Sequence, residues 1–280
     1  MAGFKRRDVL TAGLAVTGGA VLGRGARAAD EDVLAKVKAA GVLRAGTETQ
    51  FAPFDFLDNG KPAGLNYDLL AEVAKEMGVR IEFVALPWES VLPGLDVGKF
   101  DMVAGPATIT KARSERYRFS PPIADATCAI LKKAGDSSIT KPEDIAGKAV
   151  GSGKATAQLA QLKAFGEKLS PPAQVREYVD FSQAYADLAA GRIVGVANSL
   201  PNIAYVAAQR PETFALVPTP FGDKSYFGYI GRKDAPYAGL MDAFDAALLK
   251  VKADGRLAAL QQKWFKTTFD LPDHAPTPTV

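Results

Sequence analysis

The stretch that decides the fold is Val42-Leu43-Arg44-Ala45-Gly46-Thr47, together with the loop Glu48-Thr49-Gln50-Phe51-Ala52-Pro53-Phe54 that follows it. The first six residues alternate in the manner of a β-strand, and the next seven are unusually aromatic for a loop. A helical pattern comes next, with Asn66 as a candidate N-cap, apolar residues on one face and Gly78 as a stop signal. Residues 80–86 then predict a second strand.

The same alternation continues along the chain. A charged helix is expected over 31–40, a short helix over 89–97 that Pro93-Gly94 interrupts, and a buried strand over 101–104. Further strands are predicted at 127–131, 148–151, 175–179, 193–197 and 214–217, and further helices at 156–168, 182–190, 201–209, 237–252 and 257–266. This order predicts an α/β fold with mostly parallel sheets. About 250 residues after a leader fit two lobes better than one.

The first 28 residues predict an export signal. Lys5-Arg6-Arg7-Asp8 places two arginines before a weakly apolar run, and Ala26-Arg27-Ala28 supplies the small-x-small pattern that a signal peptidase reads. Paired arginines before a core of low hydrophobicity are typical of twin-arginine export, with the general secretory route as the alternative. We expect a mature chain that starts near Ala29 and is periplasmic.

Charge argues against a nucleic-acid partner. The formal net charge is +3, but the leader holds five basic residues and one acid, which leaves 29 basic and 30 acidic residues in the body. A nearly neutral body lacks the basic surface that a phosphate-backbone binder needs. The 48 % of apolar residues suffices for a core, and no stretch approaches the ~18 uninterrupted apolar residues of a membrane helix.

Cysteine and histidine counts argue against most catalytic and metal sites. Cys128 is the only cysteine, and His274, the only histidine, lies in a tail without periodicity. A Ser-His-Asp triad, a Cys-His pair or a multi-histidine metal site is therefore not expected. Gly151-Ser152-Gly153-Lys154 lacks the spacing of a phosphate-binding loop. We expect no metal, no cofactor and no catalytic residue, and a body that binds something rather than transforming it.

Seven motifs occur in a recognisable order. They are residues 46–54, Gly64-Leu65-Asn66-Tyr67-Asp68-Leu69, Gly98-Lys99-Phe100-Asp101, Thr108-Ile109-Thr110-Lys111-Ala112-Arg113, Phe119-Ser120-Pro121-Pro122, Gly191-Arg192-Ile193 and Lys263-Trp264-Phe265. In order and spacing they resemble the family 3 solute-binding proteins, which serve amino-acid ABC importers. The resemblance implies the periplasmic-binding-protein type II fold, in which two α/β lobes joined by two hinge strands close on a ligand. It places lobe 1 at 29–124 plus 226–280 and an inserted lobe 2 at 125–225.

The residues after the third strand suggest a carboxylate site. Arg113 follows two hydroxyl residues, Thr108 and Thr110. A guanidinium holds a carboxylate through two parallel hydrogen bonds, and a hydroxyl can complete the shell. The alternative is a surface arginine in a basic run. By the resemblance, Arg113 is the family's carboxylate-binding arginine and Thr108 its Ser/Thr contact.

The resemblance implies further ligand contacts. Phe51 and Trp88 occupy positions where the family has aromatic walls, and Glu48 stands where an Asp often receives a ligand ammonium. In lobe 2, Thr156 and Ala157 begin a helix whose free N–H groups suit an anion. Each has a structural alternative, namely core packing for the rings, a solvated Glu48 and a plain helix cap for Thr156.

Two positions depart from the family pattern. Ser199 stands where the family has its α-ammonium-binding Asp, and a hydroxyl cannot neutralise an ammonium. Pro106 replaces a Gly or Ser and has no N–H to offer a carboxylate. Either Glu48 takes over the ammonium, or the ligand is not a standard α-amino acid.

We therefore expect an exported substrate-binding protein of an ABC importer that captures an amino acid or a related small polar carboxylate by hinge closure. Its partners would be this ligand and the transporter permease, and we expect a monomer. One alternative is an enzyme that resembles the exported cyclohexadienyl dehydratases, with Glu48 as its acid. Another is an accessory protein that keeps the fold without binding a ligand, which Pro106 and Ser199 favour.

Overall fold

The opening strand lies inside a six-stranded sheet. In the computed structural model, which describes residues 32–280, the strand order is β5-β1-β6-β14-β7, with β8 also paired to β14. The first three strands are parallel, and β14 runs antiparallel to β6, β7 and β8. The strands are β1 (Val42–Thr47), β5 (Arg80–Ala85), β6 (Met102–Thr108), β7 (Tyr117–Phe119), β8 (Ala124–Asp125) and β14 (Tyr226–Arg232). The predicted leader, residues 1–28, lies outside the described residues.

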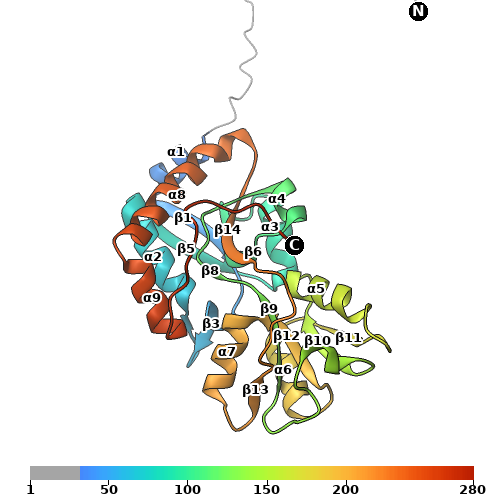
Figure 1. Cartoon of the computed structure of the whole chain (residues 1–280). Coiled ribbons are helices and arrows are strands. Elements are labelled where there is room, and N and C mark those ends of the chain that lie inside the picture. The colour runs from blue at the N-terminus through green and yellow to red at the C-terminus, as the bar shows by residue number, and fades with distance from the viewer. Residues whose placement is uncertain (1–31) are drawn as a thin grey trace, which may run out of the picture. The chain divides into compact units, whose positions relative to one another are not determined.

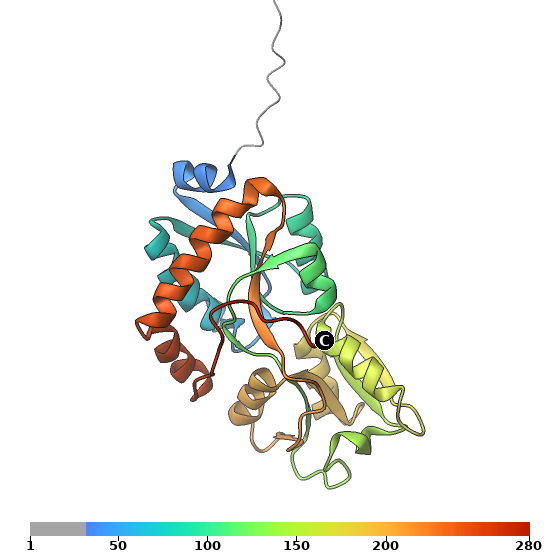
Figure 2. The same cartoon turned by 45° about the horizontal axis from the view of Figure 1, so that its top comes forward.

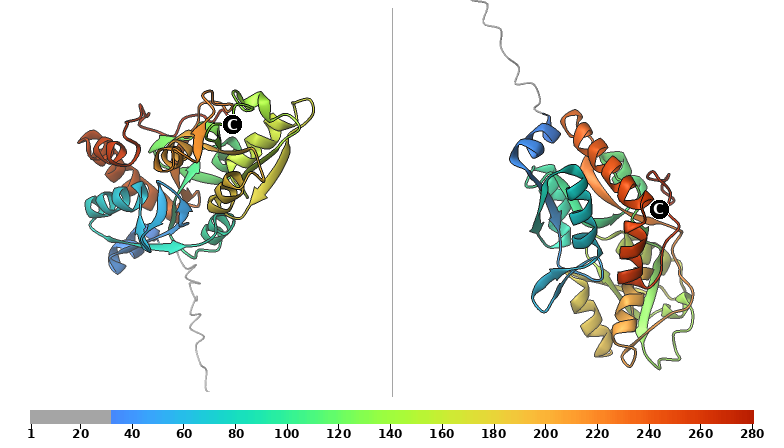
Figure 3. Two further views of the ribbon diagram at one scale, coloured as in Figure 1. Left: turned by 90° about the horizontal axis from the view of Figure 1, so that it is seen from below. Right: turned by 90° about the vertical axis from the view of Figure 1, so that its left-hand side faces the viewer.

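Helices and a small three-stranded sheet, which we call the ribbon, lie beside this sheet. We call the sheet, these helices and the ribbon together lobe 1 (Figure 1). The right-hand view of Figure 3 shows α8 and α9 running beside α2. The helices are α1 (Val33–Ala40), α2 (Leu65–Met77), α3 (Trp88–Asp96), α4 (Lys111–Arg116), α8 (Ala238–Ala253) and α9 (Arg256–Phe265). The ribbon consists of β2 (Gln50–Phe51), β3 (Asp55–Asp58) and β4 (Lys61–Ala63), and a 3₁₀ turn covers Ala235–Tyr237.

A second sheet of five strands, with its helices, makes lobe 2. Its order is β11-β10-β12-β9-β13, in which β10 is parallel to both neighbours and β9 is antiparallel to both of its own. Two connecting segments, residues 126–127 and 217–225, join the sheets. The elements are β9 (Cys128–Lys133), β10 (Ala149–Gly153), β11 (Gln174–Tyr178), β12 (Gly195–Ser199), β13 (Phe214–Leu216), α5 (Ala157–Gly166), α6 (Phe181–Ala189), α7 (Leu200–Gln209) and a 3₁₀ turn at Pro142–Ile145.

The expected N-cap of α2 is wrong by two residues. Gly64 precedes the helix with φ of +130°, a conformation that suits only glycine because a Cβ there would lie 2.1 Å from the carbonyl oxygen of Phe54. Asn66 is instead fully buried inside the first turn. Its amide donates to Asp55 (2.5 Å) and to the Ala104 carbonyl (2.9 Å), and it accepts from the Tyr229 hydroxyl (2.8 Å).

Proline and glycine mislead the sequence prediction at three places. The helix α3 continues through Pro93, and at Gly94 the Phe100 ring packs within 3 Å of where a Cβ would stand. The strand β6 extends through Pro106, which lies beside a register shift against β14, where a missing N–H disrupts no regular pairing. No strand was predicted at 226–232, since its glycines weaken strand propensity. A Cβ at Gly231 would meet the Met241 sulfur at 2.2 Å.

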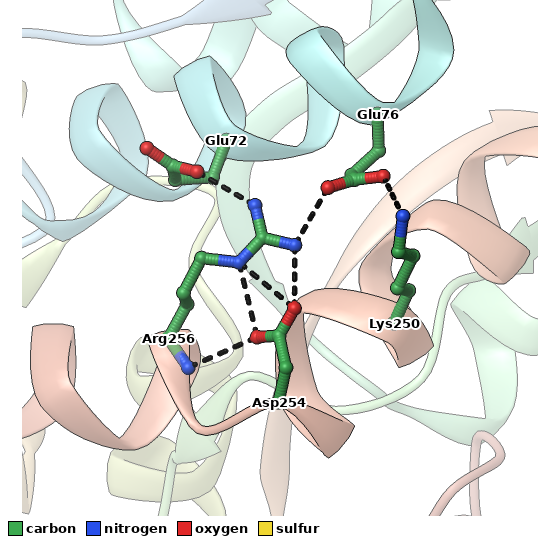
Figure 4. A network of polar contacts seen from close by, with 5 residues as sticks. All are labelled: Glu72, Glu76, Lys250, Asp254 and Arg256. Atoms are coloured by element: carbon green, nitrogen blue, oxygen red, sulfur yellow. Dashed lines mark hydrogen bonds and ion pairs between the residues drawn. The ribbon is translucent and has the colours of Figure 1, made fainter.

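A network of charged side chains fastens α2 to the turn between α8 and α9 (Figure 4). Arg256 lies 2.7 Å from carboxylate oxygens of Glu72, Glu76 and Asp254, and Lys250 reaches Glu76 at 2.5 Å. These hydrogen-bonded carboxylates raise the pKa of Arg256, since they favour its charged form. A network that shares one guanidinium holds the helices in place better than isolated surface pairs would.

Replacing Asn66 by alanine tests the buried network of lobe 1. The change leaves Asp55, the Ala104 carbonyl and the Tyr229 hydroxyl without this partner. We expect a loss of about 3 kcal/mol in the free energy of unfolding, because each buried polar group left unpaired costs roughly 1–3 kcal/mol. Urea unfolding measures the loss. The control Tyr229→Phe removes one hydroxyl and is expected to cost about 1 kcal/mol, so equal losses in the two variants would contradict the central place of Asn66.

Candidate functional site

The two lobes contact each other directly along one face. Lobe 1 contributes the loop after β1, the start of α3 and α4, and lobe 2 contributes the starts of α5, α6 and α7. The contacts include Trp88 Nε1 to the Ala155 carbonyl (3.2 Å), Arg113 Nη2 to the same carbonyl (3.3 Å), Lys154 to Glu89 (2.6 Å), Ser182 to Gln50 (2.6 Å), Asn202 to the Ala52 carbonyl (2.7 Å) and the mutually tilted rings of Phe51 and Phe181 (5.7 Å between centroids).

A small cavity of about 10 Å³ lies at the centre of this face. Six of the eight predicted ligand-binding residues line it, namely Glu48, Phe51, Trp88, Thr108, Arg113 and Thr156; Pro106, Gln158 and Phe227 complete the wall. Such a volume holds about one water molecule. A ligand as large as an amino acid therefore requires the lobes to separate or the side chains to move.

Arg113 reaches this cavity because α4 begins directly after β6. Thr110 caps the helix, accepting from the Arg113 amide at 3.3 Å. The guanidinium donates to two backbone carbonyls, Thr108 at 3.2 Å and Ala155 at 3.3 Å, and lies 5.5 Å from the Trp88 ring centroid. Among residues 32–280 it has no carboxylate partner. Desolvation lowers the pKa of Arg113 to about 10, because burial disfavours the charged form of the guanidinium.

Glu48 is the acidic side chain at the same cavity. Its side chain is 9 % exposed, and no described residue donates a hydrogen bond or an ion pair to its carboxylate. Burial, followed by repulsion from Asp55 and Asp180, raises the pKa of Glu48 to about 8. A cation beside this carboxyl would favour its ionised form and lower the pKa again.

Lobe 2 meets Arg113 through a strained turn and a helix cap. Ala155 adopts φ of +59°, rare for a residue with a Cβ, and its carbonyl accepts from both Trp88 and Arg113. The Thr156 hydroxyl caps α5, accepting from the Leu159 amide at 3.0 Å and donating to the Gly153 carbonyl at 2.6 Å. Thr156 therefore caps α5 and also lines the cavity.

Phe51 and Trp88 line the cavity wall and are also packed inside the protein. Phe51 is 5 % exposed and packs against Phe54, Phe181 and Phe227 with ring centroids 5.7–5.8 Å apart. Trp88 is 8 % exposed and anchors its indole N–H on lobe 2. Core packing, which was the alternative interpretation of these two rings, is therefore part of the role of each.

Two predicted residues do not line this cavity. Ser199 is fully buried: its hydroxyl donates to Asn202 and its amide donates to the Asn198 side chain at 2.7 Å. Asn202 in turn donates across to the Ala52 carbonyl, so Ser199 supports the contact between the lobes. Ala157 lines a neighbouring cavity of about 500 Å³ between α4 and α5, which shares Arg113 and Thr156 with the small one.

Sequence reasoning missed two wall residues. Gln158 is 2 % exposed and donates to the Thr108 hydroxyl across the lobes at 3.5 Å. The signal in the sequence that could have indicated Gln158 is its position two residues after the Thr156 cap. Phe227 was missed with the strand β14 that carries it. Within the described part of the chain no group of three metal-ligating side chains occurs, and no helix there is long and apolar enough to span a membrane.

Comparison with known proteins identifies the family. Residues 43–267 match the bacterial extracellular solute-binding proteins, family 3. The chain belongs to this family. Among its relatives, the L-cystine-binding protein TcyJ of Escherichia coli K12 is 31 % identical over 239 residues, covering 85 % of this chain and 87 % of that protein. The lysine/arginine/ornithine-binding periplasmic protein of the same organism is 29 % identical, covering 80 % and 87 %.

Solved structures confirm the periplasmic-binding-protein type II fold of this family 3 protein. An ancestral arginine-binding protein bound to arginine is 33 % identical with a TM-score of 0.74, over 80 % of this chain and 98 % of that one. The ancestral amino acid-binding protein AncCDT-1, a precursor of cyclohexadienyl dehydratase, is 30 % identical with a TM-score of 0.75, over 83 % and 99 %.

The raised pKa of Glu48 predicts a pH-dependent stability. Between pH 4.5 and about 8 the folded chain holds a proton that the unfolded chain has released, so stability falls as pH rises through this window. Glu48→Gln lacks this loss. We expect urea unfolding to show that the variant gains on the wild type as pH rises from about 4 to about 8. Glu115→Gln, an exposed change, is the control; a constant difference between Glu48→Gln and wild type would refute the raised pKa.

Proposed function

We propose that this chain is the substrate-binding protein of an ABC importer, capturing an amino acid or a related small zwitterion. The observation that carries the proposal is the presence of one basic and one acidic side chain, Arg113 and Glu48, on one inter-lobe cavity, neither with a charged partner among the described residues. A ligand with one carboxylate and one ammonium would satisfy both. The amino-acid and cystine binding stated in the names of its relatives supports the same ligand class.

In this proposal the carboxylate binds at Arg113. The guanidinium would exchange backbone carbonyls for a charged partner, and the Thr108 hydroxyl, which is buried beside it, would add a hydrogen bond. The free N–H groups at the start of α5 supply donors from lobe 2. Pro106 offers none, so the proposed carboxylate relies on side chains more than on the β6 backbone.

The ammonium binds at Glu48 in this proposal. Ser199 is occupied in holding Asn202 and carries no charge, so the buried Glu48 carboxyl is the acidic group of the small cavity. A neighbouring cavity of about 260 Å³ is lined by Glu48, Trp88 and Asp180, and it gives the cationic end of a longer ligand room to extend. The Trp88 face adds a cation–π contact there.

Hinge closure supplies the mechanism. Contacts from both lobes to one ligand stabilise the closed arrangement over the open one, in proportion to the ligand's differential affinity. The direct contacts at Ala155 and Ala52 show which backbone groups meet when the lobes touch. As an exported periplasmic protein and a monomer, it would present the closed form to the permease of its transporter.

Arg113→Met is expected to abolish binding without unfolding the protein. Losing two charge-assisted hydrogen bonds, each worth roughly 1.5–3 kcal/mol, raises the dissociation constant about 100-fold or more. Calorimetry after unfolding and refolding, with a panel of amino acids and their deaminated and decarboxylated analogues, measures this. The control Arg116→Met removes an exposed guanidinium that pairs with Asp96 at 2.7 Å. A variant that fails to fold but binds normally per folded molecule would rule out the ligand role of Arg113.

The role of Glu48 predicts a pH-dependent affinity. Since the carboxyl must be ionised to hold an ammonium, affinity is expected to rise as pH increases toward and through about 8, with a proton released on binding. Calorimetry in buffers of different ionisation enthalpy counts that proton. Glu48→Gln should bind weakly and without pH dependence. An unchanged pH profile in the variant would remove Glu48 from the site.

A second candidate is an enzyme similar to cyclohexadienyl dehydratase. It is favoured by Glu48, because a cleft carboxyl with a pKa of about 8 is protonated at neutral pH and can donate a proton. Turnover of prephenate or arogenate in the same panel would favour this candidate, and binding without turnover favours the transport protein.

A further inference from the structure

The last thirteen residues lie beyond the region that matches the family, yet they are fixed to the body. The family match ends at residue 267. Lys252 of α8 donates to the Leu271 carbonyl and pairs with Asp273 at 2.6 Å, and Leu271 is 8 % exposed. Ala275 then packs against the apolar cluster around Trp88 and Tyr117. We call residues 268–280 the tail.

The end of the tail connects the segment 217–225 to the first residue of α4. The Thr279 hydroxyl donates to the Lys224 carbonyl at 3.0 Å, and the Lys111 amide donates to the Val280 carbonyl at 2.8 Å. Lys224 lies in the segment 217–225 that returns from lobe 2 to lobe 1, and its ammonium pairs with Asp125 at 2.6 Å, just before the other connecting segment. Lys111 is the first residue of α4, the helix that holds Arg113.

The tail also reaches the boundary between the lobes. Val280 lines the cavity of about 500 Å³ whose other walls come from α4 and α5. Figures 1 and 2 show the dark-red trace crossing the body from α9, with its end beside α5. The tail thus starts on one side of lobe 1 and ends where lobe 1, lobe 2 and a connecting segment meet.

We propose that the tail is a strap that restrains opening of the lobes and positions α4 with Arg113. Opening bends the connecting segments 126–127 and 217–225, because they are the covalent links between the sheets. Opening also separates α4 of lobe 1 from α5 of lobe 2, and the hydrogen bonds of residues 279 and 280 to Lys224 and Lys111 hold Val280 on the wall between these two helices. The strap therefore favours the closed arrangement and slows ligand release.

Three variants separate the strap from general effects of sequence change. One ends at Ala275 and removes both terminal contacts. Thr279→Val keeps the tail but removes the hydroxyl that donates to Lys224. Thr277→Val is the matched control, because Thr277 is exposed and no described residue shares a hydrogen bond with its hydroxyl.

The first readout needs no ligand. Spin labels at Lys75→Cys on α2 and Lys168→Cys after α5, both exposed positions, report the distance between the lobes by pulsed electron paramagnetic resonance; Cys128 is fully buried and does not compete. We expect a longer and broader distance distribution in the shortened chain, an intermediate one in Thr279→Val and the wild-type one in Thr277→Val. Identical distributions in all four proteins would overturn the strap.

The second readout rests on the proposed function. For an amino acid that binds the wild type, we expect release to be about three- to tenfold faster in the shortened chain, since the two hydrogen bonds that hold the end of the tail are lost from the closed form. Stopped-flow tryptophan fluorescence measures release. Failure of the wild type to bind any amino acid would count against the proposed function alone, while an unchanged release rate would count against the strap alone.

Discussion

A single buried amide ties together the parts of lobe 1 on which the site depends. Asn66 joins the ribbon strand β3 through Asp55, the strand β6 through Ala104 and the strand β14 through Tyr229. These elements flank the loop 48–54, so the position of Glu48 follows from this network. One oxygen of Asp55 has no partner, and burial raises the pKa of Asp55 to about 8. Asp55 of this network, together with Asp180 of lobe 2, adds to the effect of burial in raising the pKa of Glu48.

Arg113 and Glu48 have no charged partner among the described residues at the inter-lobe site, and the proposed zwitterion would supply one to each. Desolvation lowers the pKa of Arg113 and raises that of Glu48, which means that burial disfavours both charges where they stand. Backbone carbonyls solvate the guanidinium in part, but they do not neutralise it. The proposed ligand, with a carboxylate and an ammonium, would offer each group a counter-ion, and its binding energy would include relief of that penalty. The same arrangement would couple affinity to pH.

Several residues of the site line the cavity and also have a structural role. The Phe51 ring belongs to an aromatic cluster as well as to the cavity, and Thr156 caps α5 at the point where it faces Arg113. Ser199 does not line the cavity, because its hydroxyl is used within lobe 2 to orient Asn202 toward Ala52. The departure from the family pattern at this position therefore replaces a charge with a contact between the lobes.

The sequence by itself determined most strands and helices, because alternation, caps and glycine stops are local signals. The resemblance to the family, which the sequence motifs carry, pointed to eight binding residues, of which six line the cavity. Only the tertiary structure placed β14 in the centre of its sheet, where Gly231 is required by contact with Met241. It alone showed Asn66 as a buried link, Ser199 away from the cavity and Gln158 beside Thr108. These placements depend on hydrogen-bond partners that lie from 3 to 163 positions away in the sequence. Which polar groups need such a partner depends on which of them the packing shields from water.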